Sequence, residues 1–116
     1  VKKNNIDMYI GTGGAPEGVL AAAALKCIDG QMQCRLLFND DLQKERAKKM
    51  GIKNLNKKYN INDLIKSNAI FVASGVTDGS LLRGIKKRVN KFITNSFIIS
   101  TQTKKIDFIE SDFKIP

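Results

Sequence analysis

A glycine-rich turn at residues 11–18, Gly-Thr-Gly-Gly-Ala-Pro-Glu-Gly, lies between an apolar run and an alanine-rich segment and restricts the local fold strongly. The apolar run at residues 6–10 predicts a short buried strand, and Pro16 is suited to the first position of a helix. Apolar residues at helical spacing continue that helix from Glu17 to about residue 28. The sequence therefore predicts a strand, a turn and a helix N-terminus whose free amides face an anion.

One residue of this turn, Glu17, is a candidate for a site. The Glu17 carboxylate is suited to binding a hard divalent cation next to a substrate phosphate, and glycines let a ligand approach the backbone. A structural alternative remains open, because a carboxylate in the first turn also interacts favourably with the helix dipole. The dinucleotide-binding pattern would require glycine at Pro16, and no Gly-Lys-Ser/Thr follows, so neither nucleotide motif is met.

The rest of the sequence alternates between strand-like and helix-like segments. This order favours one α/β domain over residues 1–116, with a mixed, mainly parallel sheet flanked by helices and a C-terminal β-hairpin. We expect strands at residues 33–38, 69–74, 91–100 and 105–111, a helix capped within residues 39–41 that runs to Met50, and a short helix capped by Asn62.

A second glycine turn, residues 75–80, contains Asp78. It leads into residues 81–83, which we interpret as a helical turn capped by Asp78 or Ser80. A metal-binding role for Asp78 is the alternative. Because Thr-Asp-Gly-Ser is ordinary turn chemistry, we interpret Asp78 as structural.

Composition limits the chemistry that this chain can carry out. It has no histidine, which excludes Ser/His/Asp and Cys/His catalytic sets, and its two cysteines, Cys27 and Cys34, cannot form a zinc site alone. We expect both to be reduced core thiols. Its 20 basic and 11 acidic residues give a net charge of +9, which raises the question of an anionic partner. No apolar run is long enough to span a membrane, so we expect a soluble, cytoplasmic protein.

Several segments together resemble class II fructose-1,6-bisphosphatase of the GlpX type. The strongest are residues 13–27, Gly-Gly-Ala-Pro-Glu-Gly-Val-Leu-Ala-Ala-Ala-Ala-Leu-Lys-Cys, and residues 75–84, Gly-Val-Thr-Asp-Gly-Ser-Leu-Leu-Arg-Gly. Shorter matches at residues 32–33, 35–37 and 108–110 follow the family's order. The resemblance spans nearly the whole chain, but only the C-terminal part of that family.

The resemblance implies a cytoplasmic hydrolase of gluconeogenesis and glycerol metabolism that removes the 1-phosphate of fructose 1,6-bisphosphate, and in some members of sedoheptulose 1,7-bisphosphate, with Mn²⁺ or Mg²⁺. The family that the chain resembles belongs to the lithium-sensitive phosphatases, whose active site lies between two α/β domains. Carried over by position, Glu17 is a metal ligand and Gly14 contacts the sugar phosphate. The other metal ligands belong to the family's N-terminal domain, a missing partner here, so we expect this polypeptide alone to be inactive. The resemblance also implies a homo-oligomer at full length.

The chain departs from the family at residues 95–96, where Asn-Ser replaces His-Ser, and at residues 86–91, where a glycine-rich turn is usual. Two other classes of function remain open. One is a non-catalytic sugar-phosphate or nucleotide-binding module that uses the same turn. The other is a basic RNA-binding domain, which is disfavoured because the chain offers no aromatic platform for base stacking; we therefore expect no nucleic-acid partner.

Overall fold

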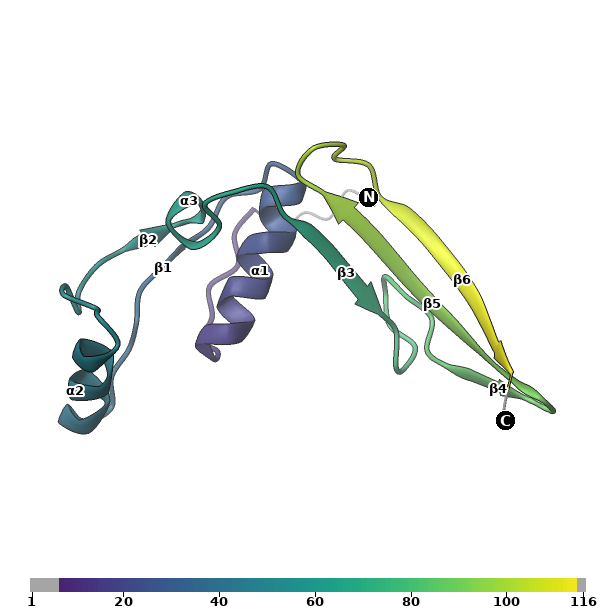
Figure 1. Ribbon diagram of the computed structural model, residues 1–116, viewed down its shortest axis with the longest axis horizontal. Helices are drawn as coiled ribbons and strands as arrows, with labels where there is room; N and C mark the ends of the chain where they lie inside the picture. The colour runs from purple at the N-terminus through teal and green to yellow at the C-terminus, as the bar shows by residue number, and fades with distance from the viewer. Residues whose placement is uncertain (1–6, 115–116) are drawn as a thin grey trace.

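The computed structural model describes residues 7–114 and, within them, three helices and six strands. In Figure 1 the chain forms an arch, with α2 at one end, the β4–β5 tip at the other, and α1 between them. The elements in chain order are α1 (Ala15–Cys27), β1 (Gln33–Cys34), α2 (Asp41–Lys49), β2 (Tyr59–Asn60), α3 (Ile61–Leu64), β3 (Ile70–Ser74), β4 (Lys86–Arg88), β5 (Lys91–Ser100) and β6 (Asp107–Lys114).

All the strand pairs among the described residues are antiparallel, so the expectation of a mainly parallel sheet is wrong. β5 is the central strand of the larger sheet, with β3 and β4 on one side and β6 on the other. β1 pairs only with β2. A parallel pair needs a crossover that returns to the same sheet, and the strand that follows α1 joins the small sheet instead. The C-terminal β-hairpin, β5 to β6, is confirmed.

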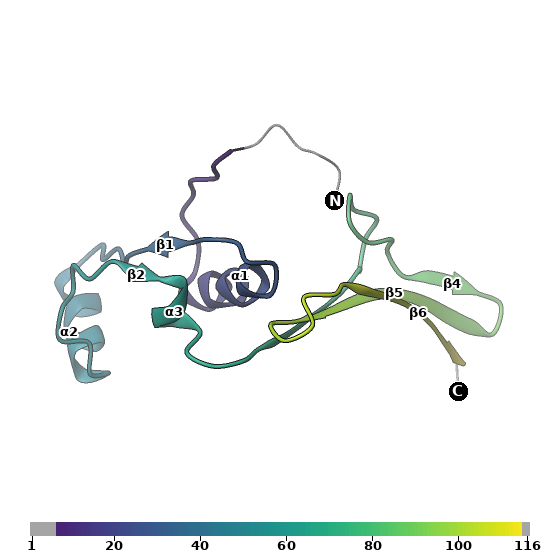
Figure 2. The same ribbon diagram turned by 90° about the horizontal axis from the view of Figure 1, so that it is seen from above.

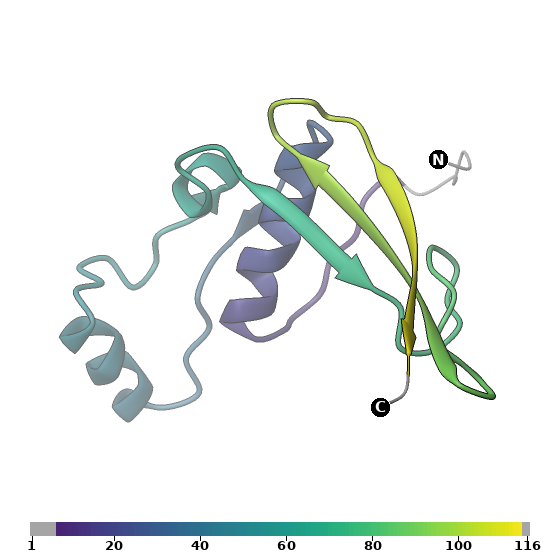
Figure 3. The same cartoon turned by 45° about the vertical axis from the view of Figure 1, so that its right-hand side comes forward.

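The core lies where α1 packs against one face of the larger sheet. In Figure 3 β3 crosses in front of α1. Cys27, at the end of α1, is fully buried, and its Sγ lies 3.6 Å from the Ile99 carbonyl oxygen. Phe97 is also buried there, with Phe71 packed against the cluster. Both cysteines are free, and Cys27 is the core thiol that the sequence predicts, whereas Cys34 is half-buried.

The chain is open in shape. Its radius of gyration is 18.1 Å and its extents are 53 × 33 × 28 Å, whereas a compact domain of this length has a radius of about 13 Å. Seen from above in Figure 2, the segment with β1, β2 and α2 projects away from the larger sheet. The core described above is therefore small for a chain of 116 residues.

Several local expectations need correction. Residues 7–10 form no strand, because none of the described strands pairs with them, and their side chains are exposed. Residue 6 lies outside the described residues. The strand expected at residues 33–38 extends only over Gln33–Cys34. The α3 helix is capped by Asn60 rather than Asn62, in a reciprocal capping box with Asp63. The expected helix to Met50 is confirmed, with Asp40 as its cap.

The capping box of α3 should make this helix sensitive to acid. The pKa of Asp63 lies below its ordinary value of 3.8, because the Asn60 amide donates to the carboxylate and Lys57 pairs with it. The folded state thus favours the ionised form, and this stabilisation is present above pH 3.8 and lost as the pH falls through the lower folded value. We expect NMR amide signals of residues 61–64 to shift over that acidic range. The Asp63→Asn variant should lack this transition, and an unchanged transition would contradict the assignment.

Candidate functional site

The candidate site lies at the N-terminus of α1. Gly14 is the N-cap residue, with extended backbone angles (φ −67°, ψ 153°), and no side chain caps the helix. The first helical hydrogen bond runs from the Gly18 amide to the Gly14 carbonyl, at 3.0 Å. The amides of Ala15 and Glu17 come before this bond and donate to no other group among residues 7–114. Pro16 has no N–H to satisfy, so the helix begins with exposed donors that suit an anion.

The structure brings Gly14 and Glu17 together. The Glu17 side chain folds back toward the helix start, so a Cβ added to Gly14 would meet its Oε2, and its Cδ would lie 3.2 Å away. Both residues are exposed. A carboxylate and free backbone amides therefore face the same solvent-accessible place, which is the arrangement required to bind a cation next to an anionic group.

The donor set at this turn is partial. Glu17 forms no ion pair or hydrogen bond within residues 7–114, so its two oxygens are available. Carboxylate oxygen is the ligand type that Mg²⁺ and Mn²⁺ prefer, but Mg²⁺ takes about six oxygen ligands. Over the same residues no group of three or more His, Cys, Asp or Glu side chains could hold a metal ion. Glu17 thus fits such a cation as one ligand among several.

Asp78 holds its own loop together. Its Oδ1 accepts a 2.8 Å hydrogen bond from the Gly84 amide, and the Gly79 amide donates to the Leu82 carbonyl at 2.9 Å. Residues 81–83 form no helix, so the expected helical turn is wrong: the loop closes through these bonds instead of through helical ones. The interpretation of Asp78 as structural agrees with this geometry.

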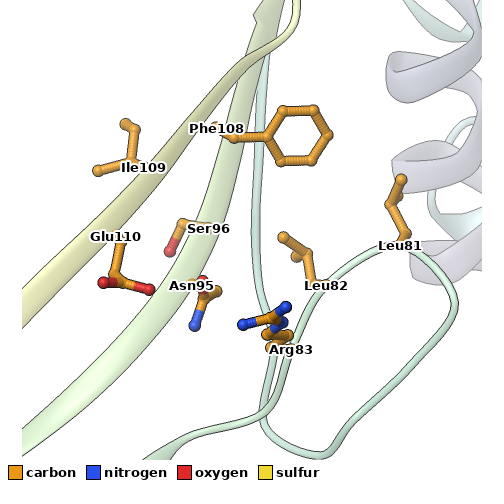
Figure 4. A pocket seen from close by; sticks show the side chains of 8 residues that line it. All are labelled: Leu81, Leu82, Arg83, Asn95, Ser96, Phe108, Ile109 and Glu110. Atoms are coloured by element: carbon orange, nitrogen blue, oxygen red, sulfur yellow. The ribbon is translucent and has the colours of Figure 1, made fainter.

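A separate pocket of about 290 Å³ lies between this loop and the sheet. Figure 4 shows the Arg83 guanidinium beside the Asn95 side chain, with Phe108 at the apolar end. Sequence reasoning missed this pocket, because its lining comes from the loop, β5 and β6, which only the strand register brings together. None of its lining residues belongs to the turn at residues 11–18.

The sequence is similar to known proteins of one enzyme family. A family model described as bacterial fructose-1,6-bisphosphatase, glpX-encoded, matches residues 1–113. The chain is 33% identical over 120 residues to the class 2 fructose-1,6-bisphosphatase of Haemophilus influenzae, covering 91% of this chain and 36% of that protein. It is equally similar, at 33%, to a D-fructose 1,6-bisphosphatase class 2/sedoheptulose 1,7-bisphosphatase of Synechocystis sp., covering 92% and 35%. The chain thus spans about a third of the length of these relatives.

Proposed function

The chain belongs to the bacterial, glpX-encoded fructose-1,6-bisphosphatase family, and on that premise we propose that it is the C-terminal α/β domain of a two-domain sugar-bisphosphate phosphatase. The resemblance drawn from the motifs is thereby confirmed at the level of the family. The proposed reaction is hydrolysis of the 1-phosphate of fructose 1,6-bisphosphate. Sedoheptulose 1,7-bisphosphate is a second substrate, since the Synechocystis relative is named for both activities.

The observation that carries this proposal is the contact between Glu17 and Gly14 at the start of α1. We assign Glu17 as a ligand of Mn²⁺ or Mg²⁺ and Gly14 as the backbone contact of the sugar phosphate. The free amides at this helix start supply donors for phosphate oxygens. Because glycine at position 14 has no side chain of its own, the Glu17 carboxylate can lie over its backbone.

The bound cation would polarise phosphoryl oxygens and lower the pKa of an attacking water. Glu17 alone supplies too few ligands to hold it. We therefore propose that the remaining ligands, and the group that activates the water, come from the part of the enzyme that this chain does not include. On this account the 116-residue chain is inactive by itself.

The sheet face opposite α1 supports the presence of such a partner domain. By strand register this face carries Ile70 and Val72 of β3 and Phe113 of β6. They are 68%, 56% and 57% exposed, respectively, and within residues 7–114 the helix that contacts β3 and β5 is α1, on the other face. Covering each such side chain would contribute roughly 1 to 3 kcal/mol. We propose that the N-terminal domain of the same enzyme packs here.

The experiment is a phosphate-release assay with three samples: this chain, an N-terminal domain corresponding to the rest of the relatives, and the two combined. We expect hydrolysis of fructose 1,6-bisphosphate only in the combined sample and only with Mn²⁺ or Mg²⁺. Metal-dependent turnover by the N-terminal sample alone would contradict the proposal that this chain and the N-terminal domain both contribute ligands to the metal site. Turnover by the 116-residue chain alone would contradict its proposed incompleteness.

We extend the family's setting to this protein as part of the same proposal: a cytoplasmic enzyme of gluconeogenesis and glycerol metabolism that is a homo-oligomer at full length. No helix in the described part of the chain is long and apolar enough to cross a bilayer. Size-exclusion chromatography with light scattering of the full-length enzyme tests the oligomer.

A further inference from the structure

Three cationic residues lie side by side in a row that crosses three neighbouring strands at the β4–β5 tip. Arg88 of β4 is the register partner of Lys91 of β5, and Lys91 is also the register partner of Lys114 of β6. Directly opposite residues of antiparallel strands share a face, with Cβ atoms about 4.5 to 5.5 Å apart. We call Arg88, Lys91 and Lys114 the cation row. Like charges in this arrangement repel, so the row costs stability unless an anion lies over it.

The surroundings of the cation row offset little of this repulsion. Lys91 pairs with Asp112, whereas Arg88 and Lys114 have no acidic partner within residues 7–114. Lys86 lies on the same face, two residues before Arg88 on β4. All three row residues line an open groove of about 780 Å³, together with Val89, Asn90 and Ile93. Among the described residues the groove is thus lined by three cations and no carboxylate, with Lys86 and Asp112 beside it on the same sheet face.

We propose that the cation row binds a linear oligophosphate. Strands lie about 4.8 Å apart, so the row extends over two such steps, or about 10 Å. A single phosphate group can bridge two neighbouring cations, whereas a chain of linked phosphates reaches all three. None of the groove's lining residues is aromatic, so the groove has no platform for stacking bases. This favours a phosphate chain over a nucleic acid.

The cation row shares no residue with the turn at residues 11–18. It lies on β4, β5 and β6, at the end of the arch opposite α2 in Figure 1. The proposal therefore does not depend on the roles of Gly14 and Glu17, and its failure would leave those roles intact.

The test is a calorimetric titration of the full-length protein with tripolyphosphate, in EDTA so that no divalent metal contributes, and at about 0.1 M salt, where charges are screened over about 10 Å. The test variant Arg88→Gln with Lys114→Gln removes two cations and keeps the Lys91–Asp112 pair. The matched control, Lys48→Gln with Lys49→Gln, removes the same charge from exposed positions of α2. Any binding at the turn of residues 11–18 is common to all three proteins.

We expect the test variant to bind tripolyphosphate about tenfold more weakly than the unaltered protein, and the control less than about twofold more weakly, because salt-screened charges act over about 10 Å. Without the anion the test variant should be at least as stable as the unaltered protein, since repulsion is relieved. Equal losses in both variants, or no binding by the unaltered protein, would overturn the proposal. Orthophosphate binding as tightly as tripolyphosphate, or single-stranded RNA binding more tightly, would also overturn it.

Discussion

Replacing Glu17 by Gln in the full-length protein is expected to lower the rate of metal-dependent phosphate release by roughly 100-fold or more. Loss of a residue that merely orients a metal ligand already costs about 10- to 100-fold, and here the ligand's charge itself is lost. Gln keeps the size of the side chain. Because Glu17 is exposed and forms no ion pair within residues 7–114, the free energy of unfolding should fall by no more than about 1 kcal/mol, which is the contribution of its charge to the helix dipole.

The matched control is Glu45→Gln, which removes the same charge from an exposed position of α2. Its rate should equal that of the unaltered enzyme. Raising the Mn²⁺ concentration should partly restore Glu17→Gln and have no effect on the control, because the lost interaction is with the metal. Equal rates in the two variants would remove Glu17 from the metal site.

Alanine at Gly75 or Gly84 should destabilise the full-length protein by about 2 to 3 kcal/mol, because overpacking against a fixed backbone costs that much. A Cβ at Gly75 would overlap the Arg83 carbonyl oxygen. At Gly84 it would lie 2.6 Å from the carbonyl carbon of Thr77 and 2.7 Å from its Cα. Backbone cannot move aside as a flexible side chain can, so the loop closed by Asp78 must open.

Chemical denaturation checks this, with Gly13→Ala as the control. A Cβ at Gly13 meets nothing within 4 Å, so this variant should stay within about 0.5 kcal/mol of the unaltered protein. If all three variants unfold at the same denaturant concentration, the close approach of Gly75 and Gly84 to the opposite backbone of the loop is wrong.

Local signals in the sequence predicted the elements that depend on neighbouring residues. Asp40 caps α2 as expected, because its side chain accepts from the Gln43 amide three residues later. The strand expected at residues 91–100 matches β5 without a change of bounds, since its apolar and β-branched content is a local property. Both depend on interactions within one short segment.

Expectations that depended on distant pairing failed. The order of strands and helices predicted parallel pairing, but the antiparallel direction of β3 against β5 is set by contacts between residues 70–74 and 96–100. The strand expected at residues 69–74 forms as β3, and its alternate side chains are exposed although its sequence is mostly apolar. β4 carries a Lys-Lys-Arg sequence with no strand signal, and its pairing follows from the two-residue connection to β5.

The candidate site was predictable only in part, because some of its contacts are local in the sequence and others depend on distant strand pairing. Gly14 and Glu17 are three residues apart in one turn, so the sequence alone places them together at the start of α1. Their proposed roles stay predictions. The cation row and the Arg83 pocket depend on strand register across β4, β5 and β6, which no local pattern encodes.

We propose that this chain supplies one carboxylate and one backbone contact to a metal and phosphate site that another domain completes. The most direct test is a crystal structure of the full-length protein with Mg²⁺ and fructose 1,6-bisphosphate. We expect a Glu17 oxygen at about 2.1 Å from the ion, the remaining ligands from the N-terminal domain, and a phosphate oxygen against the Gly14 backbone. An ion bound with complete coordination while Glu17 points into solvent would contradict the account.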